Sequence, residues 1–299
     1  MKLLFIVNPI SGDVDKEPFL EEAKELCSFY GINFLVFKTT GEQDALKLSK
    51  ILDDFKPDRV ASVGGDGTTL FTAISLLNKN IPMGIIPLGS ANGMATELYV
   101  QPEPIQALKD ILLSQMIYGL DLLKVNKEYY SMHIGDVGLN ANIVNAYEKD
   151  PNRGMITYAK YFLEELQNFE NFDIEVSTPK EHIKGSVFMA AICNSRKYGT
   201  GVPLNLIGNP MDGKFEIVLM EQLDMTSLIK AGLSAFNEKF YTYQQSKTLV
   251  TESATLKFKE PRLLQLDGEV IGKFKTIDIE IVKGAVQLIT TKANMNIQN

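Results

Sequence analysis

Residues 60–69 read VASVGGDGTT, a short apolar run followed by three glycines that surround an aspartate. This pattern predicts a buried strand that leads into a loop, because so many glycines are costly unless the backbone takes positive φ or approaches a ligand closely. Glycines and hydroxyls suit a phosphate-binding loop, whereas the carboxylate of Asp66 would repel a phosphate. If the loop binds a nucleotide, a further group must lie between the two negative charges.

Two other loops carry similar small and polar residues. They read NPISG at 8–12 and PLGSANG at 87–93, and each follows an apolar run. Loops after parallel strands meet at one edge of the sheet, where the N-termini of the following helices favour anions. Taken alone, each of these two loops is also typical of an ordinary helix cap and turn. None of the three loops has the lysine of a P-loop or the spacing of a dinucleotide-binding fingerprint.

The elements that would position these loops alternate between two periods. Apolar runs bounded by Gly, Pro, Asn or Asp predict buried strands at 2–7, 33–38, 59–63 and 83–88. Amphipathic helical patterns lie between them, and the first places Phe19 and Tyr30 on one face. Strands and helices in alternation, with short connections, predict an α/β N-terminal domain with a parallel sheet covered on both faces.

From about Asp121 the pattern changes to strict alternation, as in TIDIEIV at 276–282. Alternation predicts a β-rich antiparallel C-terminal domain, which helical patterns at 153–169 and 225–240 interrupt. We therefore expect one domain over residues 1–122, to which residues from about 288–299 return, and a second domain over residues 123–287.

The composition argues against several classes of function. The chain has 299 residues and a formal net charge of −7, so no broad basic surface for nucleic acid is expected. No stretch approaches the roughly 20 apolar residues that span a bilayer, and the N-terminal run is too short for a signal peptide. We therefore expect a cytoplasmic protein. The two cysteines and two histidines lack metal-ligand spacing, so zinc is not expected.

Together, these motifs resemble a known family. GGDGT after a strand, preceded by NPISG and followed by PLGSAN, is similar to the diacylglycerol kinase catalytic family, which includes bacterial lipid kinases and sphingosine kinases and is distantly related to NAD kinases. The resemblance continues through 119–141, through 198–220 and into QLDGEVI at 265–271. These motifs, in the family's order, form a specific match over most of the chain.

The resemblance implies an ATP-dependent, Mg²⁺-requiring kinase that phosphorylates a lipid hydroxyl, such as that of diacylglycerol. ATP would bind the α/β domain, and the acceptor lipid would enter a cleft between it and the β-rich domain. Carried over by motif, the nucleotide site would comprise Asn8, Ser11, Gly12, Thr40, Gly64, Gly65, Asp66, Gly67, Thr68, Thr69, Ser90 and Asn92.

The resemblance also implies catalytic and metal-binding roles. Glu269, in LDGE, matches the family's general base, and Asp267 and Asp66 are assigned to catalysis with it. Asp66 and Asp121 would belong to a magnesium network, so that Mg²⁺ separates Asp66 from the phosphates. Read without the family, LQLDGEVI predicts only a hairpin with an Asp-Gly turn.

A second metal site is implied in NPMDGKFEI, a segment at 209–217. Asp212 matches the family's structural magnesium site, which the backbone carbonyls of Asn209 and Lys214 would complete. The open alternative is again an Asp-Gly turn between strands.

Some positions depart from the family pattern. Asp13 occupies a position where the family usually has a basic residue. Lys16 lies nearby, but a lysine at the start of a helix is normally solvated. Leu70 and Phe71 replace Asn-Glu, which makes the glycine loop similar to that of NAD kinases, and Gly93 replaces an aspartate. Two alternatives follow: a soluble nucleotide kinase of the NAD kinase type, or a nucleotide-binding protein without catalysis. The NAD kinase type also needs an Asn-Glu pair soon after the loop, and the only one lies at 237–238.

Partners follow from the lipid kinase reading. Contact with the inner face of the membrane would be peripheral and apolar, because no polybasic run supports electrostatic docking. Edge strands of the antiparallel domain would also allow a homodimer.

Overall fold

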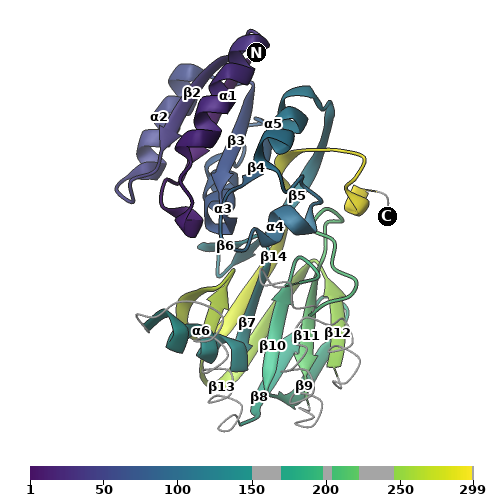
Figure 1. Cartoon of the computed structure of the whole chain (residues 1–299). Coiled ribbons are helices and arrows are strands. Elements are labelled where there is room, and N and C mark those ends of the chain that lie inside the picture. Colours follow the sequence, from purple (N-terminus) through teal and green to yellow (C-terminus); the bar gives the residue numbers. More distant parts are fainter. Residues whose placement is uncertain (150–169, 198–203, 222–245, 298–299) are drawn as a thin grey trace. The chain divides into compact units, whose positions relative to one another are not determined.

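The computed structural model describes residues 1–149, 170–197, 204–221 and 246–297. The chain divides into two compact units, one comprising Met1–Asp121 and Lys283–Asn299 and the other Leu122–Val282. Figure 1 shows their elements. The expected fold class is confirmed, since the first unit is α/β with parallel strands and the second is antiparallel and β-rich.

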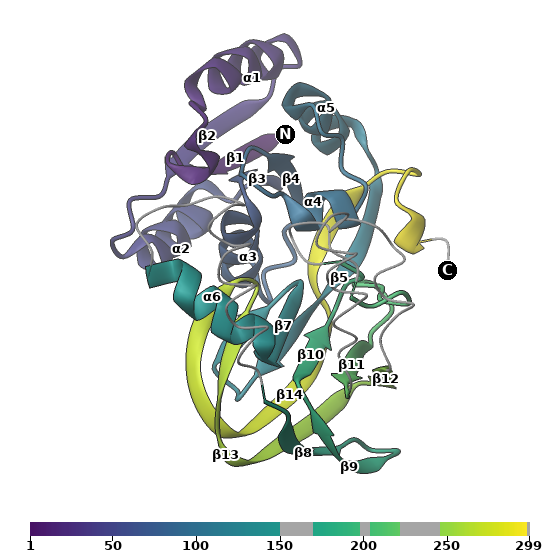
Figure 2. The same cartoon turned by 60° about the horizontal axis from the view of Figure 1, so that its bottom comes forward.

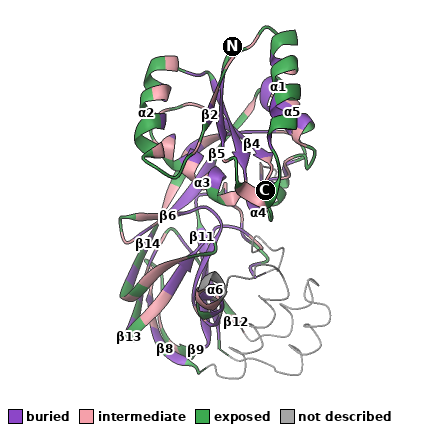
Figure 3. Ribbon diagram, turned by 60° about the vertical axis from the view of Figure 1, so that its left-hand side comes forward, coloured by how far each residue is buried: buried purple, intermediate pink, exposed green. Residues whose placement is uncertain are grey.

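The first unit is built on a parallel sheet whose order is β4-β3-β1-β2. These strands are β1 (Lys2–Val7), β2 (Asn33–Lys38), β3 (Arg59–Gly64) and β4 (Met83–Pro87). Every residue of β3 is buried, as expected for a parallel strand covered on both faces. In Figure 3 strand β4 is largely purple, whereas much of α1 and α2 is green.

Helices follow the strands in this unit. They are α1 (Glu17–Phe29), α2 (Asp44–Phe55), α3 (Asp66–Ser75), α4 (Gly93–Glu97) and α5 (Pro104–Leu113), preceded by the 3-10 helix η1 (Ser11–Asp13). On α1 the side chain of Phe19 is buried, as expected. Tyr30 is 44% exposed, so its predicted place on the buried face is wrong. The helix ends at Phe29, and Tyr30 is its C-cap residue, so Tyr30 continues the pattern in the sequence but no longer lies on the helix.

Two strands continue from one unit into the other, namely β5 (Met116–Val125) and β14 (Glu269–Thr290). The end of β14 joins the parallel sheet, where Leu288 pairs with Met83. A second 3-10 helix, η3 (Met295–Ile297), follows it, and the Asn296 side chain donates to the Glu97 carbonyl of α4 at 2.9 Å. The C-terminal segment therefore supports α4.

The second unit is an antiparallel sheet in the order β12-β11-β10-β7-β13-β14, with β8 paired to β13 and β9 paired to β8. Its strands are β6 (Tyr129–Ser131), β7 (Ile134–Gly138), β8 (Phe172–Ser177), β9 (His182–Val187), β10 (Met189–Cys193), β11 (Phe215–Met220), β12 (Ser246–Thr251) and β13 (Ser253–Leu266). Figure 2 shows the long, curved hairpin of β13 and β14.

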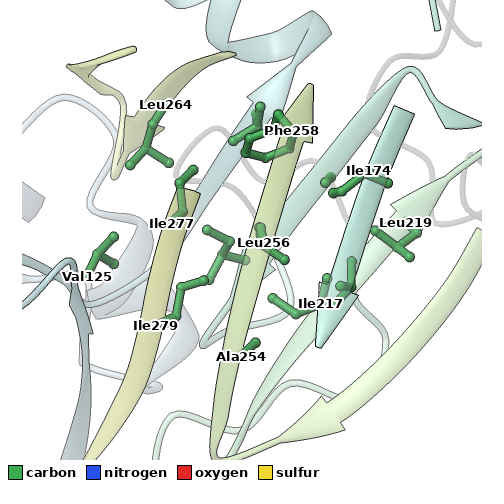
Figure 4. Packing of buried hydrophobic residues seen from close by; sticks show 14 of the residues in the cluster. Val125, Ile174, Ile217, Leu219, Ala254, Leu256, Phe258, Leu264, Ile277 and Ile279 are labelled. Atoms are coloured by element: carbon green, nitrogen blue, oxygen red, sulfur yellow. The ribbon is translucent and has the colours of Figure 1, made fainter. Parts of the chain in front are cut away.

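The core of the second unit is aliphatic. Leu256, Ile277 and Ile279 gather with Ile217 on the inner face, as Figure 4 shows. One helix, α6 (Leu139–Lys149), begins where the sequence indicated continuing strand alternation. The helices expected at 153–169 and 225–240 lie outside the described residues.

Candidate active site

The three glycine-containing loops of the first unit pack directly on one another. A Cβ atom on Gly89 would lie 2.2 Å from Cα of Gly65, and one on Gly12 would lie 2.7 Å from the carbonyl carbon of Gly89. Gly12 also has φ 67°. These glycines are therefore required for loop-to-loop packing, a reason that the sequence did not reveal. The packing brings the ends of β1, β3 and β4 into one cluster.

Asp66 connects the second and third loops. It is the first residue of α3, and its carboxylate accepts the backbone N–H groups of Gly93 at 2.9 Å and Met94 at 2.8 Å. These are the first residues of α4, so the carboxylate satisfies amides that the helix itself leaves unpaired. Asn92 shapes the same loop, because its side-chain amide both donates to and accepts from the backbone of Gly89 at 2.9 Å.

The start of α3 has the features of an anion site. Gly67 has an ordinary φ, and a Cβ placed on it would meet no atom within 4 Å, so neither packing nor conformation requires glycine there. The Oγ1 atom of Thr68 is buried and has no hydrogen-bond partner in the described part of the chain. Thr69 instead donates back to the Gly65 carbonyl at 3.0 Å. Open space, a helix N-terminus and an unsatisfied hydroxyl together suit a phosphate.

The remaining predicted nucleotide residues have mixed surroundings. Ser11 lies at the loop cluster, with its hydroxyl 3.3 Å from the carbonyl oxygens of Asn8 and Leu88. Ser90 is exposed in the third loop. Thr40 is engaged with the start of α2, where its backbone and hydroxyl both donate to the Asp44 carboxylate.

Lys16 was expected to be solvated, and this expectation is wrong. The residue is only 3% exposed, and its ammonium donates to the carbonyls of Ser11 and, at 2.7 Å, Val14. Burial lowers the pKa of Lys16. Lys16 is the only lysine or arginine within 8–16, 64–69 and 87–94. Lys16 is thus the one cation that these three loop sequences contain, and its hydrogen bonds hold the first loop.

The LDGE motif forms the turn of the β13–β14 hairpin. Leu266 pairs with Glu269, and the two residues between them, Asp267 and Gly268, have φ values of 51° and 88°. Positive φ at both positions is the type I′ turn that Asp-Gly favours, so the predicted hairpin is confirmed. The side chain of Glu269 is exposed and makes no hydrogen bond or ion pair with the described residues.

The Asp267 carboxylate faces the end of β6 and the two residues that follow it. It accepts from the Ser131 hydroxyl at 2.6 Å, from the Met132 amide at 2.8 Å and from the His133 amide at 3.0 Å. Burial raises the pKa of Asp267, against the lowering effect of these hydrogen bonds. Its two oxygens are occupied in holding the turn.

Besides Asp66, the other two carboxylates expected at metals are also hydrogen-bonded. Asp121 is buried at the end of its unit and accepts the Gly284 amide at 2.6 Å. Asp212 accepts the Lys214 amide at 2.9 Å, within a turn in which Asn209 accepts the Met211 amide at 3.0 Å. Among the residues described, no group of three or more His, Cys, Asp or Glu side chains could hold a metal ion.

Comparison with known proteins gives this arrangement a context. The model of the diacylglycerol kinase catalytic domain matches residues 2–125, and that of the YegS C-terminal NAD kinase beta sandwich-like domain matches residues 135–290. The chain belongs to the diacylglycerol kinase catalytic-domain family. The family resemblance drawn from the motifs is thereby confirmed.

Individual members of the family agree with this assignment. The protein named "Putative lipid kinase" of Staphylococcus carnosus (strain TM300) is 27% identical over 242 residues, which cover 78% of this chain and 76% of the relative. Kinase family membership thus covers both units. Within the described residues, no helix is long and apolar enough to cross a membrane.

Two solved structures share the fold of the family. One, described as a "putative diacylglycerol kinase" from Bacillus anthracis str. Sterne, has a TM-score of 0.79 at 20% identity and covers 98% of this chain and 96% of its own. The other is an NAD kinase from Archaeoglobus fulgidus in complex with ATP, with a TM-score of 0.59 at 12% identity, covering 100% and 97%. At these identities the likeness concerns the fold alone.

Proposed function

We propose that this protein is an ATP-dependent, Mg²⁺-requiring lipid kinase that transfers the terminal phosphoryl group of ATP to the hydroxyl of a diacylglycerol-like lipid. The observation that carries the proposal is Glu269, an exposed carboxylate that directly follows a turn whose two residues are both hydrogen-bonded. A fixed carboxylate that is free to take a proton is what phosphoryl transfer to a hydroxyl needs from the protein. Family membership and the name of the staphylococcal relative support the same reaction.

ATP would bind at the loop cluster of the first unit. A phosphate at the N-terminus of α3 would lie over Gly67, where the absence of a side chain leaves room for it. The Thr68 hydroxyl, buried without a partner among the described residues, would donate to a phosphate oxygen. The ammonium of Lys16 keeps the first loop in shape for this approach.

Mg²⁺ fits this site as a cation that arrives with the nucleotide. Each oxygen of the Asp66 carboxylate accepts one backbone N–H and keeps a further lone pair. Mg²⁺ usually takes one or two carboxylates and completes its coordination with phosphates and water. Asp66, with Asp121 as a proposed second member, would hold the ion, which when bound neutralises phosphate charge.

A second, structural Mg²⁺ is proposed at Asp212. The residues present fit a hard cation, because one carboxylate oxygen stays outside the bond to Lys214 and two backbone carbonyls, of Asn209 and Lys214, lie in the same turn. The turn is also closed by its own hydrogen bonds, so the ion is not needed to explain its shape.

In the proposed reaction Glu269 accepts the proton of the lipid hydroxyl. The hydroxyl oxygen forms a bond to the terminal phosphorus while the bond from that phosphorus to the leaving oxygen of ADP breaks. A general base is most effective when no other group is bonded to its carboxylate, and the Glu269 side chain makes no hydrogen bond or ion pair within the described part of the chain. Asp267, previously assigned to catalysis, is proposed to position the turn instead, since its oxygens already accept three donors.

The lipid reading also requires contact with a membrane surface. Leu206 and Ile207 are consecutive aliphatic residues that are 54% and 58% exposed. Their loop is held from within, because the Asn205 side chain donates to Glu216 at 2.6 Å and the Asn205 amide donates to the Arg196 carbonyl at 3.0 Å. We propose that this rigid loop contributes to peripheral membrane contact.

A soluble nucleotide kinase of the NAD kinase type is the second candidate. It is favoured by the glycine loop GGDGTTLFTA and by the fold shared with the archaeal NAD kinase. The test is transfer of labelled terminal phosphate from ATP and Mg²⁺ to diacylglycerol in vesicles, run beside NAD as acceptor. Label in the lipid supports the proposal, label on NAD supports the second candidate, and nucleotide binding without transfer supports a protein that has lost catalysis.

A further inference from the structure

A buried carboxylate in the second unit has no role in the proposed reaction. Asp136 lies in the middle of β7 and is fully buried, as is its neighbour Gln265 on β13. Burial of a carboxylate is costly unless hydrogen bonds compensate it. The Gln265 side-chain amide donates to the Asp136 carboxylate, across a register in which the two residues pair directly.

Gln265 connects this carboxylate to the turn. Its side-chain oxygen accepts the backbone N–H of Gly268 at 2.8 Å. Since Asp136 accepts from the nitrogen end of the same amide, the orientation of the Gln265 side chain is fixed at both ends. A continuous hydrogen-bonded path thus leads from Asp136 to the residue directly before Glu269.

The pairing of the hairpin changes at the same place. Leu264 pairs with Gly272, whereas Gln265 pairs with Val270, so one extra residue of β14 is accommodated just after the turn. Such bulges bend a strand and redirect its side chains. The bulge therefore lies two residues beyond Glu269, within the part of the hairpin that Gln265 and Asp267 hold from inside.

We infer that Gln265 and Asp136 are positioning residues for the reaction. They set the place of Glu269 through the Gly268 amide, while the other turn residue, Asp267, is held by the segment after β6. The inference rests on the proposed function, in which Glu269 is the base. A carboxylate on a loosely held turn would reach the acceptor hydroxyl less often, so that turnover falls while nucleotide binding by the first unit stays unchanged.

The test uses the full chain with Gln265→Met, which keeps the length of the side chain and removes its amide. Two quantities are measured: the hydrogen-exchange rate of the Gly268 amide, and kcat with the KM for ATP in phosphate transfer to diacylglycerol vesicles. We expect Gly268 to exchange about tenfold faster and kcat to fall about tenfold, because the hydrogen bonds of Gln265 to Gly268 and to Asp136 are lost with the geometry that they fix. The KM for ATP is expected to stay within about twofold.

Two further variants make the test specific. Thr251→Val removes two other side-chain hydrogen bonds of the same unit, which the Thr251 hydroxyl donates to the Ser253 carbonyl at 2.7 Å and accepts from the Ser253 amide at 3.3 Å. It is expected to leave kcat and Gly268 exchange unchanged. Asp136→Asn keeps an oxygen that accepts from Gln265, and is expected to change both quantities less than Gln265→Met does.

The inference is overturned if Gln265→Met leaves Gly268 exchange unchanged, if exchange accelerates while kcat does not fall, or if Thr251→Val lowers kcat as much. Absence of transfer by the unchanged protein would overturn the proposed function, and with it the catalytic part of the inference. The Gly268 exchange rate would still report on the hydrogen bond in that case, so the two failures are distinguishable.

Discussion

Replacing Asp66 by asparagine separates a structural role from a metal role at the same residue. The carboxylate accepts two backbone N–H groups, from Gly93 and Met94, at 2.9 and 2.8 Å. Asparagine keeps one acceptor oxygen and presents an NH₂ group to the other amide, so one bond is lost and one amide loses its partner. A hydrogen bond to a charged group contributes roughly 1.5–3 kcal/mol, so Asp66→Asn should lower the free energy of unfolding by about 2–3 kcal/mol.

Urea unfolding measures this loss. Asp54→Asn is a matched control, because it removes the same charge from an exposed position on α2 and should change stability by less than about 0.5 kcal/mol. If Asp66→Asn is as stable as the control, the carboxylate does not hold α4 through the amides of Gly93 and Met94.

The metal role is tested with the same variant by measuring ATP affinity with and without Mg²⁺. Asp66 should favour the metal-bound nucleotide and repel the bare one. The gain in affinity that Mg²⁺ gives the unchanged protein should therefore shrink in Asp66→Asn. An equal gain in both proteins would refute a role for Asp66 at the metal, whatever the change in stability.

Three other perturbations test separate features. Gly67→Ala meets no atom within 4 Å, so it should leave stability unchanged or slightly higher while weakening ATP binding; calorimetric titration and urea unfolding check the two parts. Burial raises the pKa of Glu216 to about 7, so near neutral pH the folded chain keeps on Glu216 a proton that the unfolded chain has released. The free energy of unfolding should therefore fall by about 3 kcal/mol as the pH rises from about 5 to 8. In urea unfolding, Glu216→Gln should not show this fall. The double change Leu206→Ser and Ile207→Ser should lower the affinity for lipid vesicles, measured by co-sedimentation, about tenfold or more. Leu46→Ser, at a position that is 72% exposed on α2, should not lower it.

Local patterns made much of the fold predictable. The strands of the first unit were evident because apolar runs bounded by turn residues form buried strands in a parallel sheet. The Asp267-Gly268 turn was evident because few residue pairs accept positive φ at two successive positions. Helix α6 was missed, since its first residues continue the alternating pattern of β7.

The candidate site was less predictable, because its details depend on partners far away in the sequence. Glycine content suggested close approach of a ligand, yet Gly65 and Gly89 serve the contact between loops, whereas Gly67 is left open. Lys16 was read as a solvated lysine because local sequence gives no sign that it folds back onto the Ser11 carbonyl. The contact of Asp66 with Gly93 spans 27 residues, a distance over which sequence patterns carry no signal.

The measurement that tests the central claim most directly is transfer of labelled phosphate from ATP to diacylglycerol by the unchanged protein and by Glu269→Gln, with ATP affinity measured for both. The proposed function predicts that the unchanged protein labels the lipid and that Glu269→Gln lowers the transfer rate by about 100-fold or more, because a base is lost. ATP affinity should be unchanged, since Glu269 lies in the second unit and the proposed nucleotide site consists of residues of the first. Equal transfer by both proteins would contradict Glu269 as the base, and no transfer to lipid by either would contradict the lipid kinase assignment.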